Sequence, residues 1–225
     1  NEQLGNNIID KKKFLTYASI NSKKISKNSI FFGIKGKNFD GNKFASEAIM
    51  NGAALAISNK KSKNPKIIFS KKPLSLFNKI SSNLRKSLNP NTIAITGSAG
   101  KTSVKELTGF CLNKLDKTFF SKLSFNNKYG VPLSIFNTPE TAKFSVLEVG
   151  MDKKGEIDHL TKLIRPNLGL ITNISYAHIK NFDNLNNIAK AKAEIINNIV
   201  CNGTMVINMD DKYHKYFLKK SKDRG

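Results

Sequence analysis

From residue 92 onward, the chain alternates between short apolar runs and amphipathic segments. The apolar runs have no helical spacing and predict buried strands at residues 92–96, 144–150, 168–174 and 204–208. The amphipathic segments repeat their apolar positions at helical intervals and predict helices at residues 102–115, 155–164 and 185–200. Strands that alternate with helices indicate a mostly parallel, doubly wound α/β sheet, whose ligands bind beyond the carboxyl ends of the strands.

Two of these helices have an apolar stripe that we expect to face the sheet. In the helix at 102–115, the stripe consists of Val104, Leu107, Cys111 and Leu115. In the helix at 185–200, the inward residues are Leu185, Ile188, Ile195, Ile196 and Ile199.

The first part of the chain has a different pattern, with apolar runs broken by Gly, Asn and Lys. These runs predict strands within residues 29–36, 52–58 and 66–70. The segment 42–52 carries apolar residues at helical spacing (Phe44, Ala45, Ala48 and Ile49) and ends on Gly52, a residue suited to a C-cap. The sequence "SLNPN" at 87–91 is typical of a turn. We therefore predict a small α/β domain at 1–90 and a larger domain at 91–225.

Bulk composition excludes several protein classes. The chain has 225 residues, without an apolar run long enough for a transmembrane helix and without an apolar signal segment near Asn1. Its two cysteines, Cys111 and Cys201, do not have zinc-binding spacing and suit a reducing compartment. We expect a cytoplasmic protein that does not insert into membranes.

The formal net charge is +22, which raises the possibility of a nucleic-acid partner. The charge is almost all lysine, however, with only Arg85, Arg165 and Arg224 as arginines. Because base-reading and phosphate-clamping surfaces rely on the planar fork of arginine, we interpret the charge as compositional bias and expect no nucleic-acid partner. It should still attract small anions.

The sequence "ITGSAGKTSVKE" at 95–106 resembles a phosphate-binding loop. Gly100, Lys101 and Thr102 match the end of the Walker A pattern G-x-x-x-x-G-K-[ST], but Ile95 stands where its first glycine belongs. A strand, a glycine loop and a helix start form the required context, because backbone N–H groups and the helix N-terminus attract anions. Lys101 would reach the β- and γ-phosphates and Thr102 would offer its hydroxyl to Mg²⁺.

Glu148 interrupts the buried run "SVLEVG" near the carboxyl end of its strand. A buried carboxylate is costly unless it is paired or binds a metal. We favour a role in sharing Mg²⁺ with Thr102 over that of a water-facing glutamate on an edge strand.

Other candidates are ambiguous by spacing alone. His178 follows a strand end but is as compatible with an ordinary surface histidine, and Lys192 lies in a segment compatible with a solvated helix face. The adjacent Asn126 and Asn127 lie in a polar turn predicted at 124–132, where they would bond a ligand or the turn itself. Asn208, Asp210 and Asp211 follow a strand and suit an adenosine contact or a plain turn.

Taken together, the ordered motifs resemble the ATP-dependent Mur ligases of bacterial cell-wall synthesis. The motifs are "TGSAGKTSVKE", "NNKYGVPLS", "EVGMDKKGEI", "RPNLGLITNISYAH" and "AKAKAEI", and "SIFFGIKGKNFDGNKF" at 29–44 is similar to the family's UDP-binding domain. The shortened loop G-x-x-G-K-T is typical of this family. The resemblance is strongest to members that join D-Ala-D-Ala to UDP-MurNAc-tripeptide.

The resemblance implies a ligase that forms a C–N bond. ATP phosphorylates the carboxylate of the UDP-MurNAc-peptide, and the amine of D-Ala-D-Ala then attacks the acyl phosphate, which forms an amide and releases phosphate. ATP and two Mg²⁺ ions are the implied cofactors. The central domain would be the ATPase domain with its phosphate loop, and the N-terminal domain would bind the UDP part of the substrate.

The resemblance also implies roles for individual residues. Lys101 would hold phosphate; Thr102 and Glu148 would hold one Mg²⁺; His178 and a carbamylated Lys192 would hold the second. Asn126 and Asn127 would line the junction between phosphate and substrate. The residues expected around the nucleotide are Gly97, Ser98, Ala99, Gly100, Lys101, Thr102, Ser103, Asn208 and Asp210. Those expected around the UDP part are Ser22, Lys23, Gly36, Phe39 and Asp40.

Three further expectations complete this interpretation. Because the alternation stops at "KKSKDRG" and residue 1 is not Met, we expect a fragment truncated before the family's C-terminal domain, unable to complete ligation alone. We expect a monomer. The alternatives are a sister ligase that adds the third amino acid of the peptide and, from another class, a basic P-loop protein that binds nucleic acid; a non-catalytic remnant is a third alternative.

Overall fold

The computed structural model describes residues 15–121, 123–176 and 181–224. It divides into two compact units, Asn1–Leu84 and Arg85–Gly225. The division falls within helix α2 (Pro73–Leu88), slightly before the domain boundary predicted at residues 90 and 91. Within the described ranges, no helix combines the length and apolar character needed to span a membrane.

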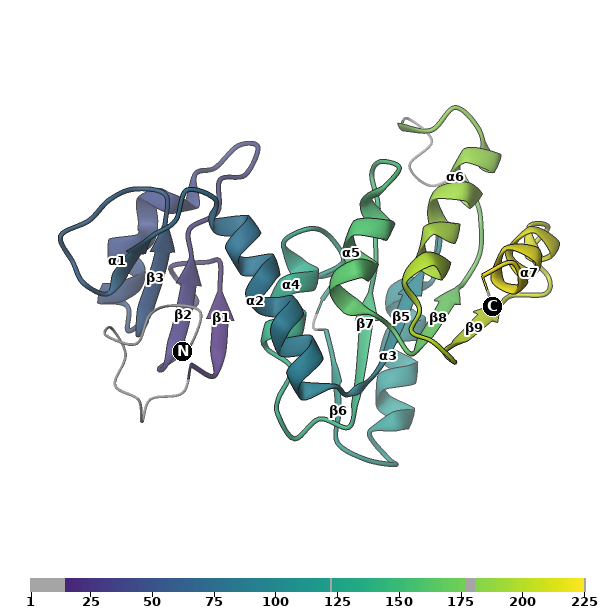
Figure 1. The fold of residues 1–225 in the computed structure, drawn as a ribbon, viewed down its shortest axis with the longest axis horizontal. Helices are drawn as coiled ribbons and strands as arrows, with labels where there is room; N and C mark the ends of the chain where they lie inside the picture. Colours follow the sequence, from purple (N-terminus) through teal and green to yellow (C-terminus); the bar gives the residue numbers. More distant parts are fainter. Residues whose placement is uncertain (1–14, 122, 177–180, 225) are drawn as a thin grey trace. The chain divides into compact units, whose positions relative to one another are not determined.

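The first unit is built on a four-stranded parallel sheet with strand order β1-β2-β3-β4 (Figure 1). Its elements are β1 (Tyr17–Ser19), β2 (Ser29–Phe32), the 3-10 helix η1 (Gly41–Phe44), α1 (Ala45–Met50), β3 (Leu55–Ser58) and β4 (Ile67–Phe69). Helix α1 packs Ala45 and Ala48 against Phe31 and Ala56 of the sheet. The C-cap of α1 is Asn51 rather than the predicted Gly52, which follows it with a φ of +102°, a conformation that costs a glycine little.

The second unit has a five-stranded, entirely parallel sheet with strand order β6-β7-β5-β8-β9, visible side by side in Figure 1. The strands are β5 (Asn91–Thr96), β6 (Thr118–Phe120), β7 (Phe144–Glu148), β8 (Leu168–Ile171) and β9 (Thr204–Ile207). After β5 the chain builds β6 and β7 on one side of it, and then crosses to build β8 and β9 on the other. This reversal confirms the predicted doubly wound fold and makes the carboxyl end of β5 the topological switch point.

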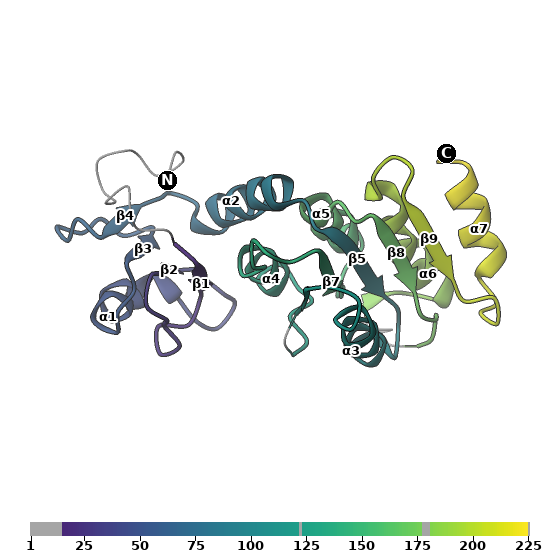
Figure 2. The ribbon, with the colours of Figure 1, turned by 90° about the horizontal axis from the view of Figure 1, so that it is seen from below.

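Helices connect these strands. They are α3 (Lys101–Leu112), α4 (Gly130–Phe136), α5 (Glu156–Ile164), α6 (Leu185–Lys192), the 3-10 helix η3 (Ala193–Asn198) and α7 (His214–Lys222). Helix α3 packs on β5, β6 and β7. Helix α7 lies beside β9, as Figures 1 and 2 both show.

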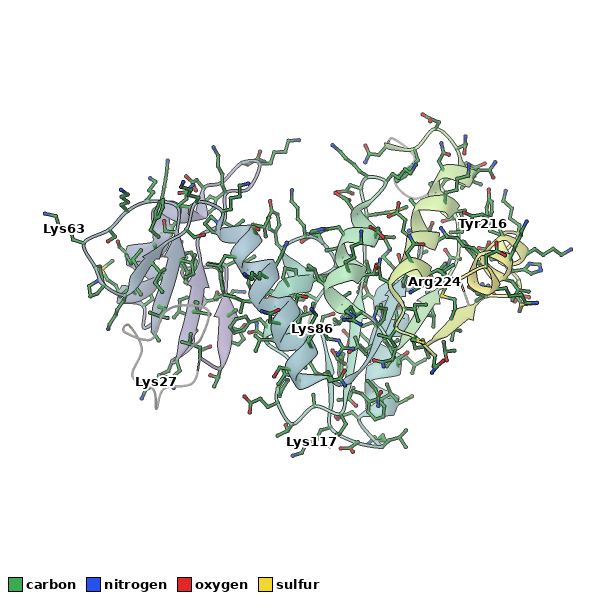
Figure 3. All side chains as sticks on the ribbon, in the orientation of Figure 1. Lys27, Lys63, Lys86, Lys117, Tyr216 and Arg224 are labelled. Atoms are coloured by element: carbon green, nitrogen blue, oxygen red, sulfur yellow. The ribbon has the colours of Figure 1, made fainter. Side chains whose placement is uncertain are left out.

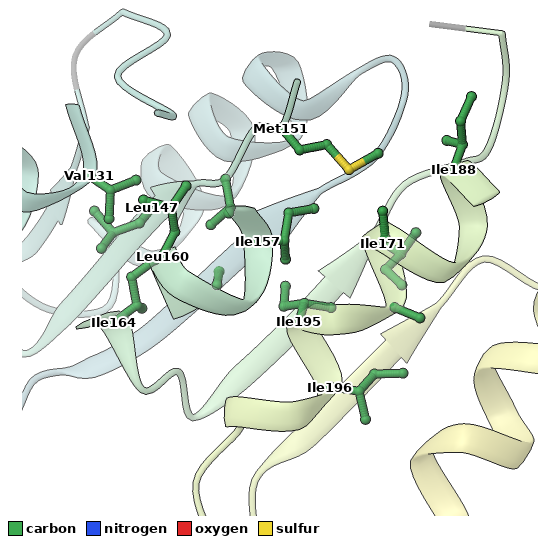
Figure 4. Packing of buried hydrophobic residues seen from close by; sticks show 14 of the residues in the cluster. Val131, Leu147, Met151, Ile157, Leu160, Ile164, Ile171, Ile188, Ile195 and Ile196 are labelled. Carbon is green, nitrogen blue, oxygen red and sulfur yellow. The ribbon is translucent and has the colours of Figure 1, made fainter. Parts of the chain in front are cut away.

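The main core of this unit lies between the sheet and helices α5 and α6 with η3. Figure 4 shows Ile157 and Leu160 of α5 beside Leu147 of β7 and Ile195 of η3, all fully or almost fully buried. A smaller cluster on the α3 side joins Ile93, Ile95 and Val146 to Val104 and Leu112. These two clusters fix the strands that carry the loops of the candidate site.

The predicted inward stripe of α3 is right for Val104, which packs against the smaller cluster, and wrong for its other three residues. Leu107 is 65% exposed, Leu115 is 77% exposed and lies beyond the helix end, and Cys111 is exposed. Lys105 and Gly109 face inward instead. Gly109 is required there because a Cβ atom would lie 2.5 Å from the ring of Phe120. Apolar spacing alone misled the prediction, since the inward face includes a glycine and a lysine.

Two other predicted elements need correction. The helix expected at 185–200 is α-helical only through Lys192 and continues as the 3-10 helix η3, although Ile188, Ile195, Ile196 and Ile199 are buried as predicted. The turn expected at 124–132 gives way to helix α4 at Gly130. Helices α2 and α7 and strands β1 and β6 were not predicted, because the helices are diluted by Lys, Ser and Asn and the strands are only three residues long.

Lysines are spread over both units rather than gathered on one element. In Figure 3, Lys27 and Lys63 lie on the first unit and Lys86 and Lys117 on the second, and all four side chains are exposed.

Candidate functional site

The glycine loop follows β5 at the switch point of the larger sheet. Gly97 has a φ of +150° and Gly100 a φ of +76°, and Gly100 is the N-cap of α3. A Cβ atom on Gly97 would lie 1.8 Å from Oγ1 of Thr172, so only glycine fits there. Since α3 begins at Lys101, its first backbone N–H groups have no partner within the helix and point out of its N-terminus. The sequence therefore builds an anion-attracting helix start at this edge of the sheet.

The segment after β8 fixes the shape of this loop. The N–H of Ser98 donates to the carbonyl of Asn173 (2.9 Å), and the N–H of Ala99 donates to Oδ1 of Asn173 (3.1 Å). Thr172 Oγ1 donates to the carbonyl of Ala99 (2.6 Å), and Ser98 Oγ donates to the carbonyl of Ser175 (3.1 Å). Sequence reasoning did not single out Thr172, Asn173 or Ser175, although their place directly after a strand end was a usable signal.

Two lysines meet at the Gly97 carbonyl. Lys101 Nζ donates to this oxygen at 2.9 Å, and Lys192 Nζ donates to it at 2.8 Å. Lys192 is 2% exposed, which rules out the alternative of a solvated helix face. Burial, and after it the charge of Lys101, lower the pKa of Lys192 to about 7. A large fraction of this amine is therefore neutral near neutral pH.

Glu148 ends β7 next to the glycine loop and is 1% exposed. Its Oε2 accepts a hydrogen bond from Thr102 Oγ1 (2.7 Å), and its Oε1 accepts one from Nδ2 of Asn126 (2.8 Å). Because β7 lies between β5 and β6, Glu148 is not on an edge strand and does not face water. A buried carboxylate and a hydroxyl together supply the oxygen ligands that Mg²⁺ prefers, so these side chains fit such an ion.

The adjacent asparagines differ in their contacts. Asn126 reaches Glu148, whereas Oδ1 of Asn127 accepts from the N–H groups of Tyr129 and Gly130, both at 3.0 Å. Asn127 thus bonds its own turn at the start of α4. Only Asn126 therefore contacts the site, and Asn127 has a local structural role.

The loop after β9 closes the other side of the site. Asn208 Nδ2 donates to the carbonyl of Thr172 (3.0 Å), and Asn208 Oδ1 accepts from the N–H of Asp210 (3.0 Å). Asp211 Oδ2 accepts from the N–H of Ile174 (2.6 Å). The loops after β5, β8 and β9 are therefore joined by hydrogen bonds at one edge of the sheet.

His178 lies outside the described residues. Among the residues that the structure does describe, no group of three or more His, Cys, Asp and Glu side chains gathers in a way that would hold a metal ion. Thr102 and Glu148 supply metal-compatible oxygens at this site.

The candidates of the first unit lie in two loops at one sheet edge. Ser22 and Lys23 follow β1, and the segment 36–40 follows β2, the parallel neighbour of β1. Because the carboxyl ends of parallel strands meet at the same edge, the two loops lie on the same side of the sheet. Ser22 Oγ donates to Oε1 of Glu47 (3.1 Å).

Within the second of these loops, the N–H of Gly36 donates to the carbonyl of Phe39 (2.7 Å). Phe39 is 63% exposed and stacks on Phe44 with ring centroids 4.8 Å apart. Asp40 is the N-cap of η1 and accepts from the N–H and Nδ2 of Asn42. The hydrogen bond from the Asn42 side chain lowers the pKa of Asp40. Asp40 therefore has a local structural role.

Comparisons with known proteins match nearly the whole chain to one family. The middle domain of Mur ligases matches residues 95–225, and the catalytic domain of the Mur ligase family matches residues 15–97. UDP-N-acetylmuramoyl-tripeptide–D-alanyl-D-alanine ligase of Buchnera aphidicola is 38% identical over 202 residues, which covers 88% of this chain and 44% of that ligase.

Solved structures agree. MurF from Acinetobacter baumannii matches with a TM-score of 0.85 and 26% identity over 93% of this chain and 47% of that one. MurF from Thermotoga maritima, solved in complex with ADP, matches with a TM-score of 0.82 and 30% identity over 94% of this chain and 50% of that one. The chain thus spans about half the length of the relatives it matches.

Proposed function

The chain belongs to the Mur ligase family, and we propose that it carries the UDP-substrate-binding and ATP-binding parts of a ligase that joins D-Ala-D-Ala to UDP-MurNAc-tripeptide. The observation that carries this proposal is the contact of Thr102 with the buried Glu148 beside the glycine loop. It puts a phosphate-binding helix start and a metal-compatible carboxylate side by side at the switch point. The names of the matched relative and of the two MurF structures favour this activity over that of a sister ligase adding the third amino acid.

ATP is the nucleotide of this proposal. Its phosphates would accept hydrogen bonds from the backbone N–H groups of Lys101, Thr102 and Ser103 at the start of α3. The Lys101 side chain would turn from the Gly97 carbonyl, its hydrogen-bond partner in this structure, towards the β- and γ-phosphates. The loop after β9, with Asn208 and Asp210, would face the adenosine. The ADP complex of the Thermotoga maritima MurF supports this choice of nucleotide.

Thr102 and Glu148 would hold one Mg²⁺. When bound, such an ion neutralises charge on phosphate oxygens and orients the transferring group. Asn126 would hold the second carboxylate oxygen of Glu148 in place.

The chemistry proposed for the whole protein has two steps. A carboxylate oxygen of the UDP-MurNAc-tripeptide takes the γ-phosphoryl group of ATP, and ADP leaves. The D-Ala-D-Ala amine then attacks the acyl carbon, a C–N bond forms, the C–O bond to phosphate breaks, and the amine loses a proton. The residues described here contribute binding, orientation and charge stabilisation rather than covalent chemistry.

Lys192 is proposed to become a carbamate that, with His178, holds a second Mg²⁺. A neutral amine attacks CO₂ and releases one proton, so the reaction needs the low pKa that burial and Lys101 give Lys192. The product exchanges a cation for an oxygen-bearing anion in the same position.

The remaining parts of the proposal concern the first unit and the setting of the protein. The loops that hold Ser22, Lys23, Gly36, Phe39 and Asp40 would contact the UDP part of the substrate. We propose a cytoplasmic monomer without a nucleic-acid partner.

The test is an isothermal titration of a non-hydrolysable ATP analogue with Mg²⁺ into the 225-residue chain, with and without UDP-MurNAc-tripeptide. We expect saturable binding that Lys101→Ala weakens at least tenfold, because the variant loses a charge-assisted contact to phosphate. Lys114→Ala, which removes an exposed lysine close to the end of α3, is the matched control and should bind like the wild type.

The two ligands separate the parts of the proposal. Nucleotide binding that survives Lys101→Ala would contradict the assignment of the glycine loop. Saturable nucleotide binding without any binding of the UDP-peptide would contradict the substrate assignment and leave the loop assignment standing.

A further inference from the structure

Lys105 is a buried lysine that the proposed reaction does not use. It lies on α3, one turn after Thr102, and its side chain is 0% exposed. Its Nζ donates to the carbonyl oxygens of Ser121 and Leu123, the latter at 3.0 Å, and pairs with Glu106 Oε1 at 2.8 Å. All three ammonium donors therefore have partners, which is the condition under which a charge can be buried.

The segment that Lys105 holds is conformationally strained. Leu123 has a φ of +55°, in the left-handed region that leucine rarely adopts, and its side chain is 70% exposed. Leucine gains little from burial in this position, so the backbone is kept in this conformation by its contacts. Lys105 provides one of these contacts directly, at the Leu123 carbonyl.

This strained turn leads directly to Asn126. The N–H of Asn126 donates to the carbonyl of Ser124 (2.9 Å), and its own carbonyl accepts from the N–H of Gly150 (2.7 Å). A Cβ atom on Gly150 would lie 2.9 Å from Cγ of Asn126, so the asparagine is packed closely against the end of β7. Its side chain then reaches Glu148.

These hydrogen bonds link Glu148 and Asn126 to two residues on the same turn of α3. Thr102 binds one oxygen of Glu148, Asn126 binds the other, and the segment before Asn126 returns to Lys105. The hydrogen bonds at Glu148 and at Lys105 are at least partly buried, and the exposed backbone of residues 123–125 connects them. We therefore expect a shift at Lys105 to move Asn126 and with it the Glu148 carboxylate.

We propose that Lys105 is a positioning residue, which holds the backbone at Ser121 and Leu123 so that Asn126 orients Glu148 for a divalent cation. The inference rests on the proposed function of Glu148 and Thr102. Groups that orient a metal ligand through hydrogen bonds are commonly worth tenfold or more in metal affinity. Lys105 acts one step further out, through the backbone of the segment.

The experiment measures Mn²⁺ affinity by electron paramagnetic resonance of the free ion, in the presence of the non-hydrolysable ATP analogue. Lys105→Met removes the donors and keeps the length of the side chain, and we expect the Mn²⁺ Kd to rise about tenfold. Glu106→Gln is the matched control, because it removes the ion-pair partner and leaves the two carbonyl contacts; its Kd should equal that of the wild type. If Lys105→Met does not fold, Lys105→Gln replaces it.

A double-mutant cycle with Asn126→Ala distinguishes positioning from general destabilisation. If Lys105 acts through Asn126, the double variant binds Mn²⁺ no more weakly than Asn126→Ala alone. The proposal would be overturned if the losses of Mn²⁺ affinity in the two single variants add up in the double variant. It would also be overturned if a folded Lys105→Met variant binds Mn²⁺ like the wild type.

A second readout does not depend on metal binding. The side-chain amide signal of Asn126 in a ¹⁵N–¹H NMR spectrum should move towards the position of a free amide in Lys105→Met and stay in place in Glu106→Gln. An unmoved signal in Lys105→Met overturns the positioning role even if the wild type binds no Mn²⁺. A wild type without Mn²⁺ affinity, together with a moved signal, would instead refute the proposed metal site.

Discussion

At the scale of single residues, the site depends on groups whose surroundings change their chemistry. Lys192 is the clearest case, because burial and the charge of Lys101 hold its pKa near 7 and its ammonium shares the Gly97 carbonyl with that neighbour. Glu148 is buried as well, but two side-chain donors satisfy its oxygens. One buried group thus loses its charge easily, and the other is held by hydrogen bonds in the orientation the proposed metal site requires.

The low pKa of Lys192 predicts a pH-dependent stability. Between about pH 7 and about pH 10.5 the unfolded chain binds a proton at Lys192 that the folded chain does not, so folding stability rises with pH across this window. Below about pH 7 Lys192 is protonated in both the folded and the unfolded chain. The folded chain then bears the full free-energy cost of burying the charged amine, about 5 kcal/mol at most. Lys192→Met should therefore be more stable than the wild type, with the largest difference at low pH.

Urea unfolding of both proteins at about pH 6 and about pH 9, in buffer free of bicarbonate, checks this expectation. Lys190→Met is the control, because Lys190 lies on the same helix and is exposed. A stability difference between Lys192→Met and the wild type that is the same at both pH values would contradict the low pKa.

At the scale of elements, helix α3 determines most of the site. Its N-terminus carries the glycine loop, Thr102 reaches β7, and Lys105 reaches the segment after β6. Its inward face includes residues that apolar patterning does not detect, above all Gly109 against Phe120. The helix is therefore oriented by close backbone approach and a buried ammonium as well as by the apolar contacts of Val104 and Leu112.

This orientation predicts unequal effects of two substitutions on α3. Gly109→Val should lower the free energy of unfolding by roughly 1–3 kcal/mol, because the new side chain overlaps the ring of Phe120. Leu107→Gln should change it by less than about 0.5 kcal/mol, because Leu107 is 65% exposed. Chemical denaturation measures both, and a larger loss for Leu107→Gln than for Gly109→Val would contradict the orientation of α3.

At the scale of the whole molecule, the two compact units have separate hydrophobic cores. The core of the first centres on Phe31 and Ala48, and that of the second on residues such as Leu147, Ile157 and Ile195. All residues that we assign to nucleotide and metal belong to the second unit. The lysines are spread over both units, so the net charge of +22 does not mark a single face.

This division predicts how a ligand stabilises the chain. A nucleotide analogue with Mg²⁺ at a hundredfold excess over its Kd should stabilise the second unit by about 2.7 kcal/mol. Hydrogen exchange followed by mass spectrometry should show slower exchange in β5, β7 and β8 and unchanged exchange in β2 and β3. Lys101→Ala should remove the effect. Equal protection of β2 and β3 would mean that the two units are thermodynamically coupled.

The sequence by itself determined the fold class, the strands around the site and the glycine loop. Alternating apolar runs and amphipathic segments specify a parallel sheet, and Gly100-Lys101-Thr102 after a strand specifies a helix start suited to phosphate. The resemblance to Mur ligases, drawn from ordered motifs, agrees with the family found by comparison. These features are local, so neighbouring residues in the sequence encode them.

Only the tertiary structure decided which distant side chains meet. Asn126, Glu148 and Thr102 are far apart in the sequence and meet because parallel strands bring their carboxyl ends to one edge. Lys192 reaches the Gly97 carbonyl from the last residue of α6, which packs on the same sheet. Burial of Lys192, which gives it a low pKa, could not be inferred from a lysine in a polar helix. The same holds for the inward face of α3, because a glycine and a lysine become core residues only when a neighbouring strand and loop close over them.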